Sequence, residues 1–246
     1  MARGIRVTLM VGGLSASPVP AAVAEALQEV QVTTTAGARS GFQLRFAVGK
    51  DDVFDRDILP SGTFDPPSRV IVVVTVDEQP SVLMDGVITR HDLAPGNEAG
   101  KSTLTLTGVD VSQMMDLIDI SAIPMPAMPA EARVALLLAP YGALYGVIPV
   151  IIPSVMLIVP SPTRHIPNRT GTDYAYISRL ADEVGYVFYV EPGPVTGVST
   201  AYSTALAPRS GAARSRPNRP VVPPRPIGRS PARRSPARRA APHRTA

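Results

Sequence analysis

Residues that could perform acid–base or metal chemistry are few and scattered in this sequence. The chain has 246 residues, no cysteine and three histidines, which are His91, His165 and His243. A zinc site usually needs ligands at short spacing on one element, such as H-x-x-x-H, and no histidine here has such a partner. We therefore interpret the three histidines as ordinary surface or loop residues, and we expect no metal and no cofactor.

The densest acidic group, at residues 51–57, could in principle supply oxygen ligands to calcium. A calcium loop that began at Asp51 would need glycine at its sixth position and glutamate at its twelfth. The sequence has Arg56 and Gly62 at those positions. We expect a solvated helical turn there instead.

Motifs for phosphate binding and nucleophilic catalysis are also missing from the sequence. The glycines of residues 11–14 and 192–197 have neither Walker nor dinucleotide-binding spacing, and no serine stands in a G-x-S-x-G pattern. A catalytic site would have to be assembled from dispersed acidic residues. This set of residues predicts a binding or structural protein, and not an enzyme.

Charge is divided unevenly along the chain. Residues 1–194 carry 13 lysines and arginines against 20 acidic residues, a net charge of −7, whereas residues 195–246 carry 11 arginines and no acid. The formal net charge of +4 therefore describes the end of the chain and not its mildly acidic body. A nucleic-acid partner is expected only through residues 195–246.

Two apolar stretches could be mistaken for targeting or membrane segments. The run at residues 7–14 is short and interrupted by glycines, so we expect no signal peptide and synthesis in the cytoplasm. Residues 134–163 carry no charge and are long enough to span a bilayer, but they contain five prolines. Each proline removes a backbone donor and leaves a carbonyl without a partner in lipid. We expect no membrane span there, but a buried helix followed by short core strands.

The elements that would position any site are strands in the first half of the chain. Apolar residues alternate at a spacing of two in residues 27–32, 42–46 and 104–106, which indicates half-buried strands. Five or six short antiparallel strands at this spacing favour a closed or nearly closed barrel.

The strand predicted at residues 70–76 is nearly continuous in apolar residues, so we expect both its faces to be covered. The cover would be a second layer or a neighbouring subunit. After the turn at residues 77–80, residues 82–89 would complete a hairpin, and the break at residues 91–101 would precede the next strand. We take as candidate assembly interface the four valines Val70, Val72, Val74 and Val76.

The apolar period changes after Asp110. Residues 111–117 indicate one or two helical turns, and residues 130–138 indicate a helix that ends near Pro140. Residues 172–185 have an N-cap threonine, an acid in the first turn and a glycine stop, so they predict the clearest helix of the chain. A strand at residues 186–190 follows directly.

The order of these elements resembles the phage late-control D family, to which the baseplate hubs of contractile phage tails belong. Similar hub domains occur in type VI secretion spikes and extracellular contractile injection systems. The resemblance covers about residues 5–194, and its most specific part is the block Asp173–Val190. Five stretches carry it: Val30–Thr33, Gly41–Phe46, Leu83–Thr89, Leu104–Asp110 and Arg169–Val190.

This resemblance implies a homotrimeric hub that presents a tail-tube-like barrel to the tail tube protein and its other face to the spike protein. It implies no active site, and a final location in a virion tail or injection-system baseplate. The expected fold class is α+β and mainly β. Residues 1–120 would form the antiparallel barrel, residues 121–194 a smaller α/β subdomain, and residues 195–246 a disordered Arg/Pro-rich tail.

The tail departs from the resemblance, because the family continues into a second barrel. Residues 195–246 have too few large apolar side chains to offset the entropy of folding, and their charges repel. The tract from Ala205 onward can be encoded by GC-rich codons. When such codons are read one nucleotide earlier, they can encode Pro-Gly-Pro-Glu-Ile-Arg, which resembles the family's continuation. A frameshifted or truncated hub is one hypothesis, and a binding module whose basic tail holds nucleic acid or an acidic partner is the alternative.

Overall fold

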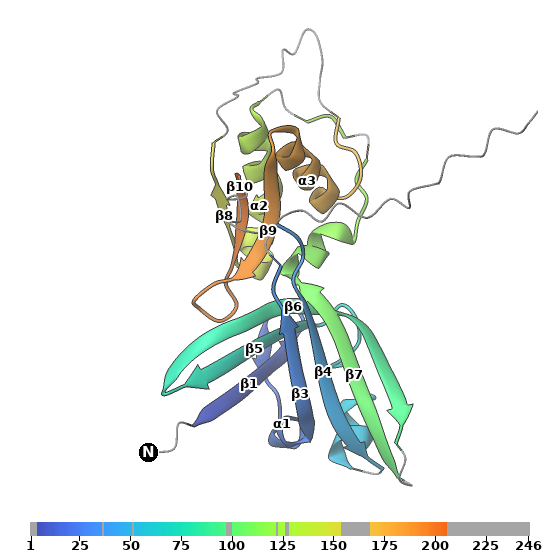
Figure 1. The fold of residues 1–246 in the computed structure, drawn as a ribbon. Helices are drawn as coiled ribbons and strands as arrows, with labels where there is room; N and C mark the ends of the chain where they lie inside the picture. The colour runs from blue at the N-terminus through green and yellow to red at the C-terminus, as the bar shows by residue number, and fades with distance from the viewer. Residues whose placement is uncertain are drawn as a thin grey trace, which may run out of the picture. The chain divides into compact units, whose positions relative to one another are not determined.

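The computed structural model describes residues 4–35, 37–50, 52–96, 100–121, 123–125, 128–153 and 168–205. Within these ranges the chain forms a seven-stranded antiparallel sheet and then a three-stranded sheet with two helices (Figure 1). The elements of the first part are β1 (Ile5–Gly12), β2 (Ala16–Pro18), α1 (Ala21–Ala26), β3 (Leu27–Thr33), β4 (Gly41–Gly49), β5 (Arg69–Val76), β6 (Gln79–Pro95) and β7 (Lys101–Asp110). The prediction of a mainly β chain with antiparallel strands is confirmed.

The first core forms because alternate residues of each strand point to one face of the sheet. Phe42, Leu44 and Phe46 of β4 are buried, whereas Arg45 between them is exposed. Phe46 packs against Phe54 and Phe64, with ring centroids 5.6 and 5.7 Å apart. The loop between β4 and β5 therefore returns aromatic rings to the core that the strands enclose.

The expectation of a closed barrel is wrong. The strand order is β2-β1-β5-β6-β7-β4-β3, and no pairing joins β2 to β3 among the described residues. The short helix α1 connects these two edge strands along the chain, and its fully buried Val23 packs in the core between them.

The hairpin predicted after residue 76 is confirmed, with a tighter turn and a longer second strand. Val76 pairs with Gln79, so the loop has two residues, and both Asp77 and Glu78 have positive φ. β6 then continues to Pro95 instead of breaking at His91. Its outer half stays extended because it pairs with β7 as far as Pro95.

The second part contains α2 (Ala130–Tyr145), β8 (Val147–Ile151), α3 (Asp173–Glu183), β9 (Tyr186–Pro192) and β10 (Ser199–Ala205). The sheet order is β8-β10-β9, with β10 parallel to β8 and antiparallel to β9. Its core residues come from one face of the sheet and from both helices, and they include Val111 and Met115 of the 3-10 turn Val111–Asp116. The second core therefore starts directly after β7.

The helix and strand predicted at residues 172–190 are present as α3 and β9. Thr172 is the N-cap, and its hydroxyl accepts a hydrogen bond from the backbone N–H of Ala175 at 3.2 Å. Ile177 and Leu180 are buried, as the helical spacing requires. Gly185 follows the helix with a φ of 73°, a conformation that glycine adopts without strain.

The predicted end of the preceding helix near Pro140 is wrong, because α2 continues through Pro140 to Tyr145. Pro140 and Leu136 one turn before it are both exposed. The carbonyl freed by the missing N–H is therefore on the solvent side of the helix, where water can satisfy it. The helix ends at Gly146, whose φ is 69°.

The prediction that disorder begins at residue 195 is also wrong. β10 lies at residues 199–205 and is the central strand of the second sheet, with Ser199, Ala201 and Ser203 buried. The remainder of the predicted tail, residues 206–246, lies outside the described residues, and so do its proposed roles. No helix among the described residues is long and apolar enough to cross a membrane.

Candidate functional site

The four valines predicted as an assembly interface lie in two different environments along β5. Val70 and Val72 are fully buried in the first core. Val74 is half-buried, and Val76 is 43% exposed. Other residues of the same chain therefore cover Val70 and Val72. Of the four valines, only Val74 and Val76 can contact another molecule.

Two residues of β1 extend this available surface. Ile5 lies opposite Val76 in the antiparallel register and Val7 lies opposite Val74, so all four side chains share one face of the sheet. Ile5 is 70% exposed and Val7 is 39% exposed. We call these four residues the β1–β5 end surface. The sequence reasoning missed Ile5 and Val7, although their alternation with the buried Leu9 was a readable signal.

The two edges of the seven-stranded sheet differ in how they can accept another strand. β2 has three residues and ends in Pro18, so it offers little backbone for pairing. β3 has seven residues without proline, and within the described part of the chain it pairs on one side only, with β4. The edge of β3 is the better template for a strand from another chain.

The junction between the two sheets is built around a buried ion pair that the sequence reasoning did not find. Arg69 of β5 and Asp85 of β6 are almost completely buried. Arg69 Nε donates to Asp85 Oδ1 at 2.8 Å, and Nη2 donates to Asp85 Oδ2 at 2.6 Å. Such a bidentate pair holds the guanidinium plane in one orientation.

This ion pair also bonds to the second part of the chain. Arg69 Nη2 donates to the carbonyl oxygens of Tyr145 at 2.9 Å and Gly197 at 3.1 Å. Ser199 Oγ donates to Asp85 Oδ2 at 2.9 Å. We call Arg69, Asp85, Ser199 and the carbonyls of Tyr145 and Gly197 the junction clasp.

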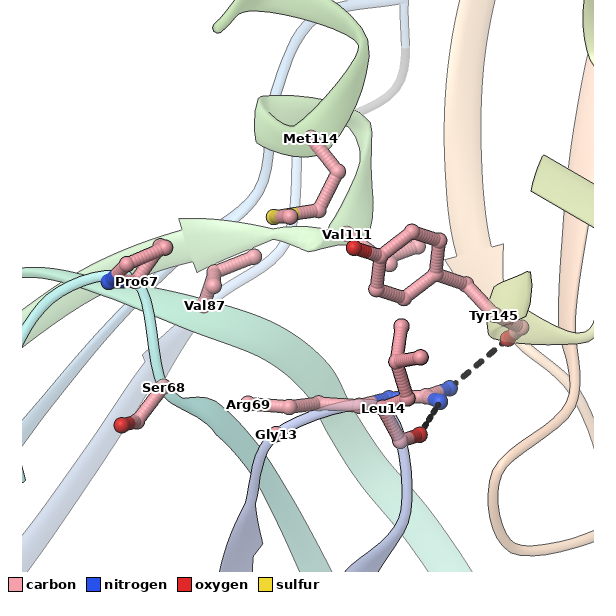
Figure 2. Close-up of a pocket in the computed structure, with 9 residues that line it drawn as sticks. All are labelled: Gly13, Leu14, Pro67, Ser68, Arg69, Val87, Val111, Met114 and Tyr145. Atoms are coloured by element: carbon pink, nitrogen blue, oxygen red, sulfur yellow. Dashed lines mark hydrogen bonds between the residues drawn. The ribbon is translucent and has the colours of Figure 1, made fainter. Parts of the chain in front are cut away.

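A cavity of about 260 Å³ lies on one side of the clasp (Figure 2). Figure 2 shows Arg69 at its floor, with the bonds to Tyr145 and Leu14 drawn as dashed lines. A second cavity, of about 280 Å³, shares Leu14, Arg69 and Tyr145 with the first. Both are smaller than most sites for drug-sized ligands. The wall residues of the first cavity are mainly apolar: Leu14, Pro67, Val87, Val111, Met114 and Tyr145.

Asp110 fixes the point where β7 passes into the second part. Its Oδ2 accepts from the backbone N–H of Ser40 at 2.6 Å, and its Oδ1 accepts from the N–H of Ser112 at 3.0 Å. Burial raises the pKa of Asp110 above its usual value, although the bonds from Ser112 and Ser40 act in the opposite direction. Asp110 is thus an N-cap and not an acid–base group aimed at a cavity.

Buried polar side chains hold the two helices of the second part together. Arg133 of α2 donates to the hydroxyl of Tyr176 at 2.6 Å, and Tyr141 donates to Asp173 at 2.8 Å. Arg169 pairs with Asp173. Burial and the bond to Asp173 raise the pKa of Tyr141 above its usual value. These contacts join α2 to α3 in the interior.

The residues considered first for chemistry are not gathered into a site in the described part of the chain. His91 lies on β6, with Nδ1 3.3 Å from the carbonyl of Phe64 and 3.4 Å from Asp65. His165, His243 and Asp51 lie outside the described residues. The acidic stretch forms a π-helical turn at Phe54–Ile58, and within the described ranges no three potential metal ligands lie together.

Comparison with known proteins finds similarity at the level of the fold. No protein-family model and no curated protein matches the chain. The half-lidded PdpA–VgrG complex of Francisella superposes with a TM-score of 0.51 at 8% identity, over 81% of this chain and 31% of that chain. The 43 kDa tail protein of prophage MuSo2 from Shewanella oneidensis gives 0.49 at 15% identity, over 83% and 56%. A tail protein from Neisseria meningitidis MC58 gives 0.48 at 17% identity, over 80% and 51%.

The chain therefore spans between about a third and little more than half of the length of these structures. They are described as a tail protein, a prophage tail protein and a PdpA–VgrG complex. What this chain shares with the Francisella complex is the arrangement of its strands and helices.

Proposed function

We propose that this chain is a structural subunit of the baseplate hub of a contractile phage tail, or of a related injection system, where it joins the tail tube to the spike. The observation that carries the proposal is the fold. This chain, with its antiparallel seven-stranded sheet and small α/β part, superposes on the PdpA–VgrG complex over 81% of its length.

The proposed assembly is a homotrimer whose subunits meet through the seven-stranded sheet. Two features support it. The β1–β5 end surface exposes four apolar side chains that would be covered by a neighbour. The open edge of β3 can accept a strand from the next subunit. Because these lie on different strands of the sheet, the contact would be head-to-tail, which closes into a ring when the rotation permits.

The proposal is tested by locating the chain on the particle that contains it. Cells that produce the protein would carry a copy with an N-terminal epitope tag, and purified particles would be labelled with gold-conjugated antibody for electron microscopy. A hub subunit should be labelled at one end of each tail, at the baseplate. Label along the tube, label at the head end, or absence of the chain from particles would contradict the proposal.

A further inference from the structure

The two parts of the chain meet at several places, which include contacts between β6 and β9 and the Arg39 guanidinium on the ring of Tyr174, and two of the remaining places differ in kind. The first is covalent and lies where β7 ends at Asp110 and the turn Val111–Asp116 begins. Arg39 reinforces it, with bonds to Gln113 at 3.0 Å and to Asp116 at 2.9 Å. The second is the junction clasp, which bonds the middle strands of the large sheet to the end of α2 and to the turn before β10.

The clasp is buried, but open space lies next to Arg69. The linings of the two cavities share Leu14, Arg69 and Tyr145. Apolar side chains therefore leave space beside Arg69 unfilled, and the contact that the clasp itself makes is polar and directional. Polar, loosely filled junctions between parts of a chain allow relative motion unless a specific contact fixes them.

We propose that the junction clasp is a conformational device: it holds the α/β part in one orientation on the seven-stranded sheet, and the α/β part pivots about Asp110–Val111 when the clasp is open. The ion pair is satisfied within the large sheet by its own two bonds, so opening the clasp leaves no unpaired buried charge. What opening removes is the set of bonds to Tyr145, Gly197 and Ser199.

The clasp can be removed without leaving one charge behind. The double substitution Arg69→Met with Asp85→Leu replaces the pair by apolar groups of similar size, an exchange that often preserves stability. The control removes the exposed pair of Arg45 and Glu29, which are 3.1 Å apart on the same sheet, by Arg45→Met with Glu29→Leu. A second variant, Ser199→Ala, takes away one clasp bond and keeps the ion pair.

Spin-label distance measurements on the full chain test the proposal directly. The chain has no cysteine, so Ala47→Cys and Asp182→Cys introduce specific labels on exposed positions of β4 and α3. The parent and the control should give one narrow distance distribution. The Arg69/Asp85 variant should give a clearly broader one at an unchanged melting temperature, and Ser199→Ala should be intermediate.

Three results would overturn the inference. A distribution as narrow in the Arg69/Asp85 variant as in the parent would mean that packing fixes the orientation. A distribution already broad in the parent would mean that the clasp does not hold. Unfolding of the large sheet in the Arg69/Asp85 variant, with Ser199→Ala unchanged from the parent, would make the pair part of the sheet's own core.

Discussion

Val72 and Val76 are four residues apart on one strand and point to the same side of it, yet only Val76 meets solvent. The difference arises because β1 and β5 extend beyond the core that Phe46 and Leu44 fill. The run of valines at residues 70–76 looked uniform in the sequence. Its division into a core half and an exposed half depends on where the other strands end, which no local pattern encodes.

Val76→Lys should therefore leave the chain folded while abolishing ring assembly. An exposed position tolerates a charge within about 0.5 kcal/mol, whereas a lysine on the β1–β5 end surface would be desolvated by the neighbouring subunit. Val72→Lys is the matched control, and it should lower stability by several kcal/mol, about 3 or more, because the charge enters the core. Analytical ultracentrifugation and circular dichroism measure the two effects. Normal assembly of folded Val76→Lys would remove this surface from the interface.

Asp110 gives the fold a pH dependence opposite to that of a paired carboxylate. Its pKa is raised in the folded state from an ordinary value of 3.8, so the folded state binds more protons than the unfolded state above that pH. The contribution of Asp110 to the free energy of unfolding is complete below pH 3.8, and it is lost as the pH rises through the raised pKa. Asp110→Asn should remove this downward slope. Urea unfolding at several pH values between about 3.5 and 6 measures it, and identical slopes in parent and variant would contradict the assignment.

At the scale of elements, strands with one covered face were predictable and the others were not. β4 and β7 alternate because one face packs on the core, so their period of two could be recognised in the sequence. β10 reads Ser-Thr-Ala-Tyr-Ser-Thr-Ala, without a large alternating residue on its buried face. Its buried side chains are small, and its partner β8 lies about fifty residues earlier.

The junction clasp was equally invisible before the register was known. Arg69 precedes an apolar run and Asp85 interrupts another, and each alone reads as the polar boundary of a strand. Register pairs Arg69 with Val87 and Ile71 with Asp85, which places the two charged side chains diagonally on neighbouring strands. Helix α3, in contrast, has its cap, apolar stripe and glycine stop within fourteen residues and was predicted almost to the residue.

Pro149 lies on β8, which has one edge without a strand partner among the described residues. Ile152 N–H donates to Ser203 on β10, so alternation turns the backbone nitrogens of Val147, Pro149 and Ile151 toward the open side. Proline removes one donor from that edge. Pro149→Thr should thus increase self-association at high concentration with little change in melting temperature, measured by light scattering. Val150→Thr is the control, because this substitution adds no backbone N–H donor on the open side of β8. Equal association of the two variants would assign the effect to hydrophobicity and contradict an edge mechanism.

At the scale of the whole molecule, the position of β10 divides the basic end of the chain into two segments with different roles in folding. Removal of residues 195–246 deletes the central strand of the second sheet, so we expect the α/β part to lose its cooperative unfolding transition. Removal of residues 206–246 should leave the melting temperature of the described part within a few degrees of the parent. Circular dichroism on both truncations tests this. An intact transition after truncation at residue 194 would show that β10 does not hold the second core.

The central claim is that this chain belongs to the hub of a contractile particle, and a cryo-electron microscopy map of the baseplate end of that particle tests it most directly. Three copies of residues 4–205 should fit density between the last ring of the tube and the spike. The β1–β5 end surface of each copy should be covered by its neighbour. A map in which the seven-stranded sheet fits no density at that position, or in which Ile5, Val7, Val74 and Val76 face solvent in every copy, would contradict the account.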